Sequence, residues 1–195
     1  ERPLWDYPDG TLAEREVAIF LLTAATGWDL VPATVLRAVP LGNGMVQLWI
    51  DDDESFDIVN AINAGSYSQL QRMALLDAIL NNSDRKVSHL LPVSHSPLHE
   101  GRLHIFGVDH GVSLSVDNKL RTVLWQWAGD PLPAEAVAML GQLSDQLAGP
   151  LGEQLGELLT TAEVRAVQRR VRRLLAKPKF PMPPTDWPAI PYPPY

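Results

Sequence analysis

The sequence predicts an α+β fold, and three observations carry this prediction. A helix-like apolar period with start and stop signals runs from residue 11 to residue 27. Two strand-like runs, 34–39 and 45–50, flank the turn-forming residues 41–44, which indicates an antiparallel hairpin. The segment from 133 to 175 is typical of helices. Helices and hairpins therefore share one chain.

The composition excludes several classes of protein. With 195 residues and 46% apolar content, the chain can bury a substantial core as one domain or two small lobes. Its formal net charge of −7 argues against a nucleic-acid partner, because such binders need a basic surface to neutralise phosphates. No apolar run approaches the length of a membrane span, and no cysteine is present for a disulfide, a thiolate metal site or a nucleophile. The lack of cysteine suits a reducing cytoplasm, where we expect the protein.

The first predicted helix starts at a capping box formed by Thr11 and Glu14, whose side chains can satisfy backbone N–H groups that lack helical partners. Gly27 is the expected stop. The apolar stripe that we expect to face the core consists of Ala13, Val17, Phe20, Leu21 and Ala24. Glu16 lies at the edge of this stripe, so we expect it to be half-buried.

The middle of the chain predicts one helix and a second hairpin. The acidic run 51–54 lacks the spaced ligands and the glycine of a calcium-binding loop, so it predicts a solvated turn. A helix is predicted over 68–82, with Leu70, Met73, Ala74, Asp77 and Leu80 near one face. Two strand-like runs, 89–93 and 103–108, are expected to pair as an antiparallel hairpin.

This second hairpin gathers charged residues from two loops. In an antiparallel pair the start of the first strand lies beside the end of the second. Asp84 precedes the first strand and Asp109 follows the second. Both are therefore expected at the same end of this hairpin, which we call the mouth, with His89 close by. Neighbouring carboxylates repel unless a cation or a proton lies between them. The pattern therefore predicts a divalent metal at this mouth.

The same two loops resemble motifs of the phosphatidylinositol 3- and 4-kinases. Residues 84–89 resemble their catalytic loop, in which Asp-Arg is followed, five positions after the aspartate, by a metal-binding asparagine. Residues 107–111, Gly-Val-Asp-His-Gly, resemble the Asp-x-Gly metal-binding motif that follows it. Glu16 resembles the glutamate that pairs with a phosphate-contacting lysine, and residues 45–50 resemble the strand and hinge that hold adenine.

The resemblance extends over nearly the full length. The whole chain, including 121–125 and 187–191, resembles an actinobacterial protein family related to the phosphatidylinositol 3-/4-kinase-like kinases. This implies a protein-kinase-like C-terminal lobe over 51–176. Residues 1–50 would then be an incomplete N-terminal lobe of capped helix, hairpin and hinge, and 177–195 a C-terminal arm rich in proline and aromatic residues.

The resemblance also implies an ATP- and divalent-metal-dependent phosphotransferase. Asp84 would be the base for the substrate hydroxyl, Lys86 would contact the transferring phosphoryl group, and Asp109 would be the main metal ligand. His89 departs from the pattern, because imidazole suits manganese, zinc or iron better than magnesium. The residues implied to bind the nucleotide are Glu16, Met45, Gln47, Leu48 and Trp49. The expected cofactors are ATP with Mg²⁺ or Mn²⁺, and the hydroxyl acceptor, on a lipid, a protein or a small molecule, stays open.

Two other classes remain as alternatives. The first is a catalytically inactive pseudokinase or interaction module that binds nucleotide without transfer. The second is a metallohydrolase, because five histidines fall within twenty-two residues: His89, His95, His99, His104 and His110. Against it, His95 and His99 are expected in the hairpin loop, and His104 is expected to pack within the second strand.

The C-terminal helical segment contains a second capping box, at Thr160 and Glu163. Beyond it, one face is apolar and the other carries Arg165, Arg169, Arg170, Arg172 and Arg173. A membrane surface or an acidic protein is a possible partner, through Arg165, Arg169 and Arg172. Such a face is more commonly solvated, with its arginines complementing the helix dipole.

The last nineteen residues contain eight prolines interleaved with Phe180, Trp187, Tyr192 and Tyr195. This composition predicts an extended arm in polyproline conformation. Its large apolar side chains favour packing on the chain's own lobe over service as a peptide ligand for another protein.

Two expectations concern buried charge. Arg85 is expected to be structural, fixing a carboxylate or backbone carbonyls beneath its loop. No glycine-bearing strand turn and no strand lysine precede Glu16. We therefore expect an upstream segment to supply the lysine, and Glu16, without a partner here, to have a raised pKa.

Overall fold

The computed structural model describes residues 4, 7, 8, 10–40, 42–96 and 99–195. Its helices are α1 (Leu12–Thr26), α2 (Ile58–Ala64), α3 (Ser68–Leu80), α4 (Ala134–Leu147), α5 (Pro150–Gly156) and α6 (Thr161–Ala176), with a 3-10 turn at Val87–His89. Two separate antiparallel hairpins are formed by β1 (Thr34–Val39) with β2 (Gly42–Gln47) and by β3 (Leu90–Ser96) with β4 (Arg102–Gly107). The predicted α+β class is thus confirmed.

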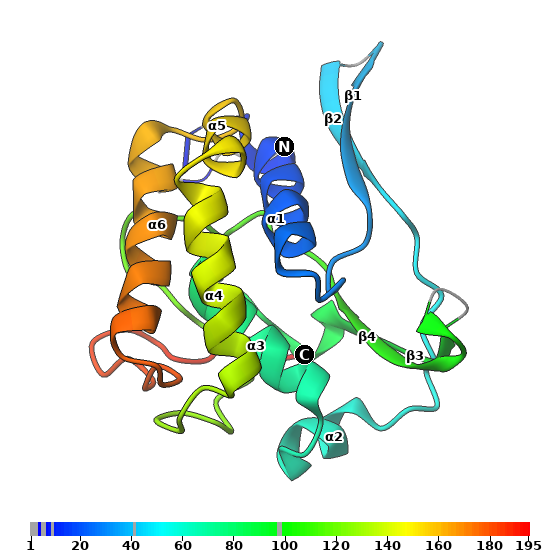
Figure 1. The fold of residues 1–195 in the computed structure, drawn as a ribbon. Coiled ribbons are helices and arrows are strands. Elements are labelled where there is room, and N and C mark those ends of the chain that lie inside the picture. Colours follow the sequence, from blue (N-terminus) through cyan, green and yellow to red (C-terminus); the bar gives the residue numbers. More distant parts are fainter. Residues whose placement is uncertain (1–3, 5–6, 9, 41, 97–98) are drawn as a thin grey trace.

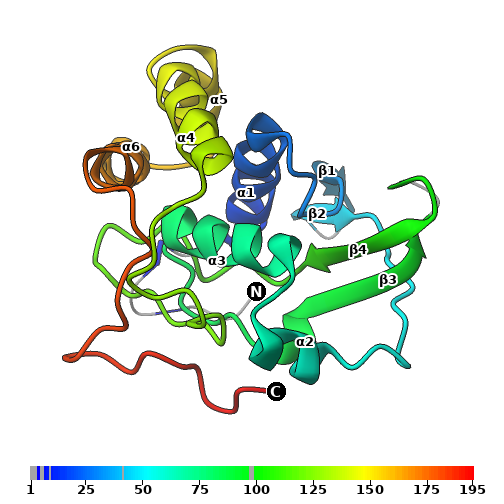
Figure 2. The same ribbon diagram turned by 60° about the horizontal axis from the view of Figure 1, so that its bottom comes forward.

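The helices and the hairpins lie on different sides of the molecule. Figure 1 shows α4, α5 and α6 on one side and both hairpins on the other, with α1 between them. Helix α1 contacts both strands of the β1–β2 hairpin and also α4 and α5. Figure 2 shows α3 running beneath α1, beside the end of β4. Among the described residues, no helix is long and apolar enough to span a membrane.

Helix α3 is the centre of the core. The predicted face of this helix is buried, and so are Leu75, Leu76, Ala78 and Ile79 around the rest of its last two turns. It contacts α6 and β4, so apolar residues are required on more than one face. The helix ends at Leu80, short of the predicted residue 82, because its C-cap Asn81 adopts a left-handed backbone that asparagine tolerates.

The predicted start and stop of α1 are confirmed, but the predicted capping box at its start is wrong. The Thr11 hydroxyl donates to the Pro8 carbonyl at 2.8 Å and makes no cap hydrogen bond to the helix, so the capping box with Glu14 does not form. Gly27 adopts a left-handed conformation with φ of 68°, and its N–H donates to the Ala24 carbonyl. Glycine adopts this conformation without the steric cost that a Cβ imposes.

The buried face of α1 is also offset from the predicted stripe. Ala24 of the predicted stripe is exposed and the other stripe residues are half-buried. The buried residues of α1 are instead Arg15, Glu16, Ala18, Ile19, Leu22, Thr23 and Thr26. The spacing of apolar residues predicted the wrong buried face of α1, because two charged residues of this helix have partners inside the protein. Arg15 pairs with Glu163 on α6, and Glu16 binds His110. Glu16 is therefore buried rather than half-buried.

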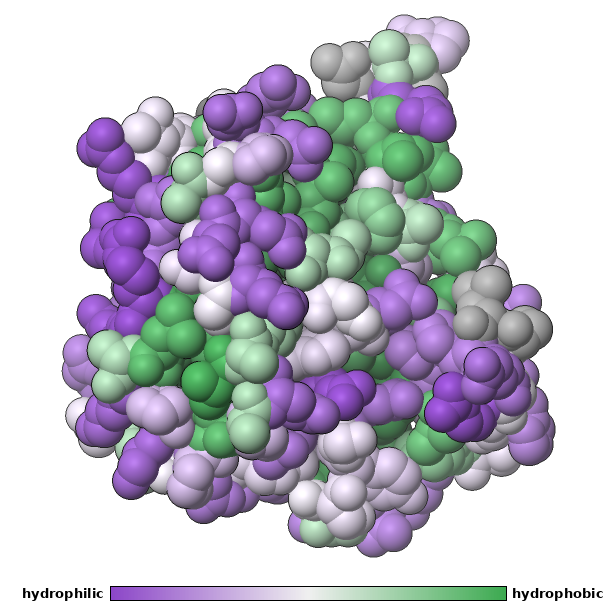
Figure 3. Space-filling model, in the orientation of Figure 1, coloured by the Kyte–Doolittle hydropathy of each residue, from purple (hydrophilic) through white to green (hydrophobic). Residues whose placement is uncertain are grey.

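The first hairpin has a tighter turn than predicted. Val39 already pairs with Gly42, so residues 42–44, expected in the turn, belong to β2, and Leu41 lies outside the described residues. Strand β2 ends at Gln47, short of the predicted residue 50. Figure 3 shows apolar surface over this hairpin. The exposed apolar side chains here are Val35, Met45, Val46, Leu48 and Trp49.

Residues 51–57 contain a turn, as predicted, and are followed by the unpredicted helix α2. The Asp57 carboxylate accepts from the Asn60 N–H at 2.9 Å. An aspartate that begins a seven-residue helix in this way is an ordinary N-cap, so the cap signal was available at Asp57.

The C-terminal third is helical, as predicted, and forms three separate helices. Breaks at 148–149 and 157–160 separate α4, α5 and α6, and the predicted capping box at Thr160 and Glu163 is confirmed. The arm beyond α6 packs on the chain, as expected. The Pro194 carbonyl accepts from the Val87 N–H at 2.9 Å, which joins the arm to the loop that carries Asp84.

The buried pair of Arg15 and Glu163 yields a stability prediction. Burial raises the pKa of Glu163, but hydrogen bonds from Arg15 and Thr160 lower it more, so the pKa lies below its ordinary value of 4.5. Because folding lowers the pKa of Glu163, its ionised carboxylate stabilises the folded state. This stabilisation is complete above pH 4.5 and is lost as pH falls through the folded-state pKa. Glu163→Gln is expected to lower the free energy of unfolding at neutral pH by about 2 kcal/mol.

Urea unfolding of the wild type and of Glu163→Gln from neutral to acidic pH measures this effect. The difference between the two proteins should shrink as pH drops below 4.5. The matched control is Glu153→Gln, which removes an exposed carboxylate from α5. A difference that stays constant with pH would show that the charge of Glu163 does not stabilise the fold.

Candidate functional site

The β3–β4 hairpin brings the two loops together as predicted. Leu90 pairs with Gly107, and the Val108 N–H donates to the His89 carbonyl at 3.0 Å. Consequently His89 Nε2 lies 3.4 Å from Asp109 Oδ2. Gly107 packs closely on Met73, because a Cβ there would lie 2.8 Å from Cε at the end of that flexible side chain. This end of the hairpin is the mouth that the sequence indicated.

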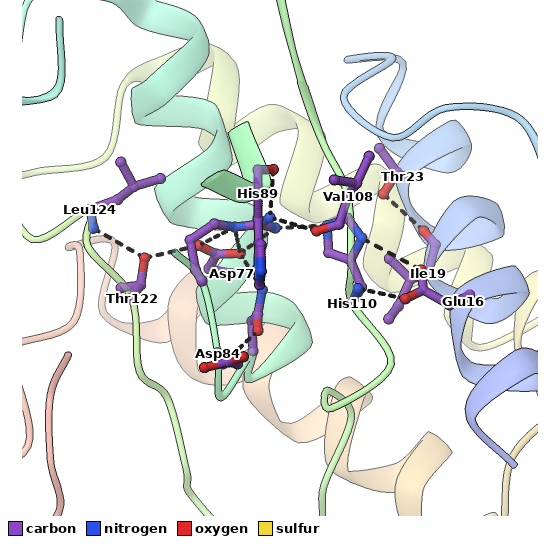
Figure 4. A network of polar contacts seen from close by, with 12 residues as sticks. Glu16, Ile19, Thr23, Asp77, Asp84, His89, Val108, His110, Thr122 and Leu124 are labelled. Carbon is purple, nitrogen blue, oxygen red and sulfur yellow. Dashed lines mark hydrogen bonds and ion pairs between the residues drawn. The ribbon is translucent and has the colours of Figure 1, made fainter. Parts of the chain in front are cut away.

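Arg85 holds the mouth together from beneath. Its side chain is fully buried, and Nε and Nη2 donate to the carboxylate of Asp77 on α3 at 2.9 to 3.2 Å. Nη1 donates to the carbonyls of His89 at 3.3 Å and Val108 at 3.1 Å. One guanidinium thus binds a carboxylate and both strand ends, which confirms the expected structural role of Arg85. Figure 4 shows these contacts.

Asp77 and Asn82 position the loop that carries Asp84. The Asn82 side chain donates to Asp77 at 3.1 Å and accepts from the Asp84 N–H at 3.0 Å. Thr122 donates from its hydroxyl to the same carboxylate at 3.0 Å. The charge of Asp77 is therefore fully hydrogen-bonded, as a buried carboxylate requires.

The network continues through His110 to α1. Arg85 Nη2 lies 2.7 Å from His110 Nε2, and because a guanidinium only donates, this nitrogen accepts. Burial and the charge of Arg85 hold the pKa of His110 below its usual value, so the ring is neutral with its proton on Nδ1. Nδ1 faces Glu16 Oε2 at 3.7 Å.

Glu16 has a partner, contrary to the expectation from the sequence. Its Oε1 accepts from the His110 backbone N–H at 2.6 Å. Burial raises the pKa of Glu16, but the contacts from His110 and its backbone outweigh burial and leave the pKa below its usual value. The predicted raised pKa is therefore wrong. The expected partner was a lysine, whereas the partner in the structure is a backbone donor 94 residues away.

Asp84 and Lys86 lie at the accessible side of the mouth. Lys86 Nζ is 3.1 Å from Asp84 Oδ2, and the two side chains are 21% and 27% exposed. The Asp109 side chain is 65% exposed. Asp109 adopts a left-handed backbone with φ of 55°, which turns the chain immediately after β4. Both carboxylates and the ammonium group are therefore accessible to solvent.

Asp109 and His89 are the residues at the mouth that fit a metal ion. Among the described residues, no group of three or more histidines or carboxylates is assembled to hold one. Magnesium bound with a nucleotide takes one or two carboxylates and completes its shell with phosphates and water, so a single exposed carboxylate suffices. Burial holds the pKa of His89 below its usual value although Asp109 acts in the opposite direction, which leaves a neutral imidazole.

A cavity of about 310 Å³ adjoins the mouth. Its lining residues are Gln47, Leu48, Trp49, Ile50, Asp52, Leu91 and Val108. Three of the five predicted nucleotide-binding residues, Gln47, Leu48 and Trp49, thus line one cavity. Neither Met45 nor Glu16 lines it. Leu91 and Val108 were not predicted at this site, although the predicted hairpin places both beside the metal motif and could have identified them.

The five histidines do not form one centre. His99 stacks on His104 with ring centroids 3.5 Å apart, and His104 Nε2 contacts the Asp29 carbonyl at 2.8 Å. His95 lies in β3 rather than in the loop, and its ring contacts the Gly101 carbonyl at 3.3 Å. His110 is buried against Arg85. Because these rings serve separate packing contacts, the histidine cluster gives a metallohydrolase no support.

The fold defines a mixed α+β protein. A mycobacterial relative shows that it belongs to an actinobacterial family. The chain is 39% identical over 228 residues to Protein Rv2133c of Mycobacterium tuberculosis, a match that covers 97% of this chain and 80% of that protein. It belongs to the same family as this mycobacterial protein. No family model matches the chain.

A more distant similarity reaches a plant protein. The chain is 28% identical over 152 residues to Phosphatidylinositol 4-kinase gamma 4 of Oryza sativa subsp. japonica. This match covers 69% of the chain but only 26% of the rice protein.

Proposed function

We propose that the chain is the nucleotide-binding and catalytic lobe of an ATP- and divalent-metal-dependent phosphotransferase of the phosphatidylinositol 3-/4-kinase-like type. The observation that carries the proposal is the continuity between the cavity and the mouth. Val108 lines the cavity, and the next residue is Asp109, 3.4 Å from His89. The partial match to the rice kinase supports the same class.

The cavity suits the base of a nucleotide. Its walls combine Leu48 and Trp49 with the apolar side chains of Leu91 and Val108. Binding sites of this kind are mostly apolar, with a few polar groups that fix orientation. With the base in this cavity, the phosphates would extend past Val108 toward Asp109 and Lys86.

Asp84 and Lys86 supply the chemistry of transfer. The Asp84 carboxylate accepts the proton of the acceptor hydroxyl, whose oxygen forms a bond to the γ-phosphorus of ATP. The bond from that phosphorus to the bridging oxygen breaks, and ADP leaves with the electron pair. Lys86 offsets the negative charge that develops on the transferring group. Asn82 and Arg85 hold the loop, so the carboxylate meets its substrate in a fixed position.

Asp109 is the proposed main ligand of the metal, with His89 as the second. These two side chains would hold Mg²⁺ or Mn²⁺, which would supply positive charge to offset that of the phosphates. The neutral imidazole of His89 favours manganese over magnesium, because manganese accepts nitrogen ligands more readily. The acceptor alcohol belongs to a lipid, a protein or a small molecule.

One observation favours the alternative of nucleotide binding without transfer. The carboxylate of Glu16 is taken by the backbone N–H of His110 at 2.6 Å, so it is not presented to a phosphate-contacting lysine. A module of this kind would bind ATP at the same cavity and transfer no phosphate.

Thermal unfolding with ATP tests the proposal. We expect ATP together with Mn²⁺ or Mg²⁺ to raise the unfolding temperature, and neither component alone to do so. His89→Asn should shift the preference toward magnesium, because an amide oxygen replaces the imidazole nitrogen. Absence of stabilisation with either metal would contradict nucleotide binding. Incubation with labelled ATP and cell-extract fractions then separates the two functions, since only the enzyme labels an acceptor.

A further inference from the structure

A second concentration of charge lies on α6, far from the mouth. Figures 1 and 2 both show α6 on the opposite side of the molecule from the β3–β4 hairpin. The exposed guanidinium groups on this helix belong to Arg165, Arg169, Arg172 and Arg173. None of the ion pairs formed between described residues includes any of these four. Their charges therefore remain available to a ligand.

Part of this charge converges on a cavity. A hollow of about 70 Å³ is lined by Val116, Asn118, Ala166, Arg169, Arg170 and Arg173. One water needs only about 10–15 Å³ of such volume, so the hollow has room for a small tetrahedral group. Three of its six lining residues are arginines, and none is a carboxylate.

Arg170 is anchored at this hollow by two backbone carbonyls. Its Nε donates to the Ile79 carbonyl at 2.8 Å and its Nη1 to the Ser115 carbonyl at 3.0 Å. Its Nη2 is buried and has no hydrogen-bond partner among the described residues. Burial and then the charge of Arg169 lower the pKa of Arg170 to about 10, while Tyr7 acts in the opposite direction and Arg173 adds a smaller decrease. Repulsion between neighbouring guanidinium groups is unfavourable, and an anion in the hollow relieves it.

We propose that Arg169, Arg170 and Arg173 form a binding pocket for a phosphate monoester. A guanidinium presents paired donors that match phosphate oxygens, and three of them can share the oxygens of one dianionic group. The Asn118 amide is a further donor at the rim. This ligand chemistry occurs in soluble phosphate esters and in the headgroup of a phosphomonoester lipid.

One wall of the pocket is formed by the loop that follows Asp109. Ser115 and Asn118 belong to the loop after Asp109, and the Asn81 side chain donates to the carbonyls of Ser115 at 3.3 Å and Asp117 at 2.6 Å. The floor of the pocket is therefore held by α3 as well as by α6. It is formed before a ligand arrives, which limits the ordering that binding requires.

Calorimetric titration with inorganic phosphate and with glycerol 3-phosphate tests the pocket. The titrations contain no divalent metal, so they do not depend on the function proposed at Asp109. Arg169→Gln/Arg173→Gln is expected to weaken binding by roughly tenfold or more for each guanidinium removed. The matched control is Arg165→Gln/Arg172→Gln, which removes the same charge from the same helix outside the pocket and should bind like the wild type.

Vesicles distinguish the two sources of the phosphate group. Phosphatidylcholine vesicles with phosphatidic acid are compared with vesicles of phosphatidylcholine alone. Tighter binding to the first, lost in Arg169→Gln/Arg173→Gln alone, assigns the pocket to a lipid headgroup. Binding of the soluble probes without vesicle binding assigns it to soluble esters. Equal loss in both double variants, or no binding of phosphate in either form by the wild type, would overturn the proposal.

Discussion

Asp84→Asn is expected to slow phosphate transfer by roughly 10²- to 10⁴-fold, the usual effect of removing a general base. Asparagine keeps the shape of the side chain but accepts no proton from the acceptor hydroxyl. Metal-dependent ATP binding should largely survive, because the cavity and Asp109 are unchanged. Asp109→Asn should instead abolish the metal-dependent thermal stabilisation by ATP, since it removes the charge of the main proposed ligand.

These two variants are compared by thermal unfolding with ATP and metal and by transfer from labelled ATP. Asp145→Asn on α4 is a suitable control, because its exposed carboxylate lies outside the mouth and the cavity. An equal loss of nucleotide binding in Asp84→Asn and Asp109→Asn would contradict the assignment of separate roles. Full transfer activity in Asp84→Asn would show that another group accepts the proton.

The second large effect is expected from the buried pair of Arg85 and Asp77. Arg85→Met should lower the free energy of unfolding by roughly 3–5 kcal/mol, the usual cost of leaving a buried charge without its partner. Both side chains are 0% exposed, so water cannot replace the lost contact. The change also removes the donors to the carbonyls of His89 and Val108, so the mouth should lose order together with stability.

Denaturant unfolding at neutral pH measures this effect. The control is Arg102→Met, which breaks an ion pair with Glu100 whose side chains are 75% and 81% exposed. A change below about 1 kcal/mol is expected there, because exposed pairs are screened by solvent. Similar losses in both variants would show that Arg85 is not the central support of the mouth.

Local signals in the sequence predicted much of the architecture. The Gly27 stop, the capping box at Thr160 and the β3–β4 hairpin depend on hydrogen bonds between residues near one another in the chain. Such contacts follow from residue type and spacing alone. The same hairpin was sufficient to bring His89 and Asp109 together, because antiparallel pairing places the start of the first strand beside the end of the second.

Contacts between distant segments could not be read in this way. The first capping box failed because Thr11 found another acceptor, and the buried face of α1 was misplaced because Arg15 and Glu16 found partners on α6 and at His110. The burial of α3 on several faces likewise depends on which elements surround it.

The residue types, their order and their local periods were therefore enough for the α+β class, the hairpin mouth and most element ends. The partners of buried charges, the cavity beside Trp49 and the arginine pocket on α6 came only with the packed chain. The physical reason is the separation, along the chain, between the residues that interact. A cap or turn is stabilised within a few residues, whereas the partner of Glu16 lies 94 residues away and is selected by how α1 packs against the end of β4.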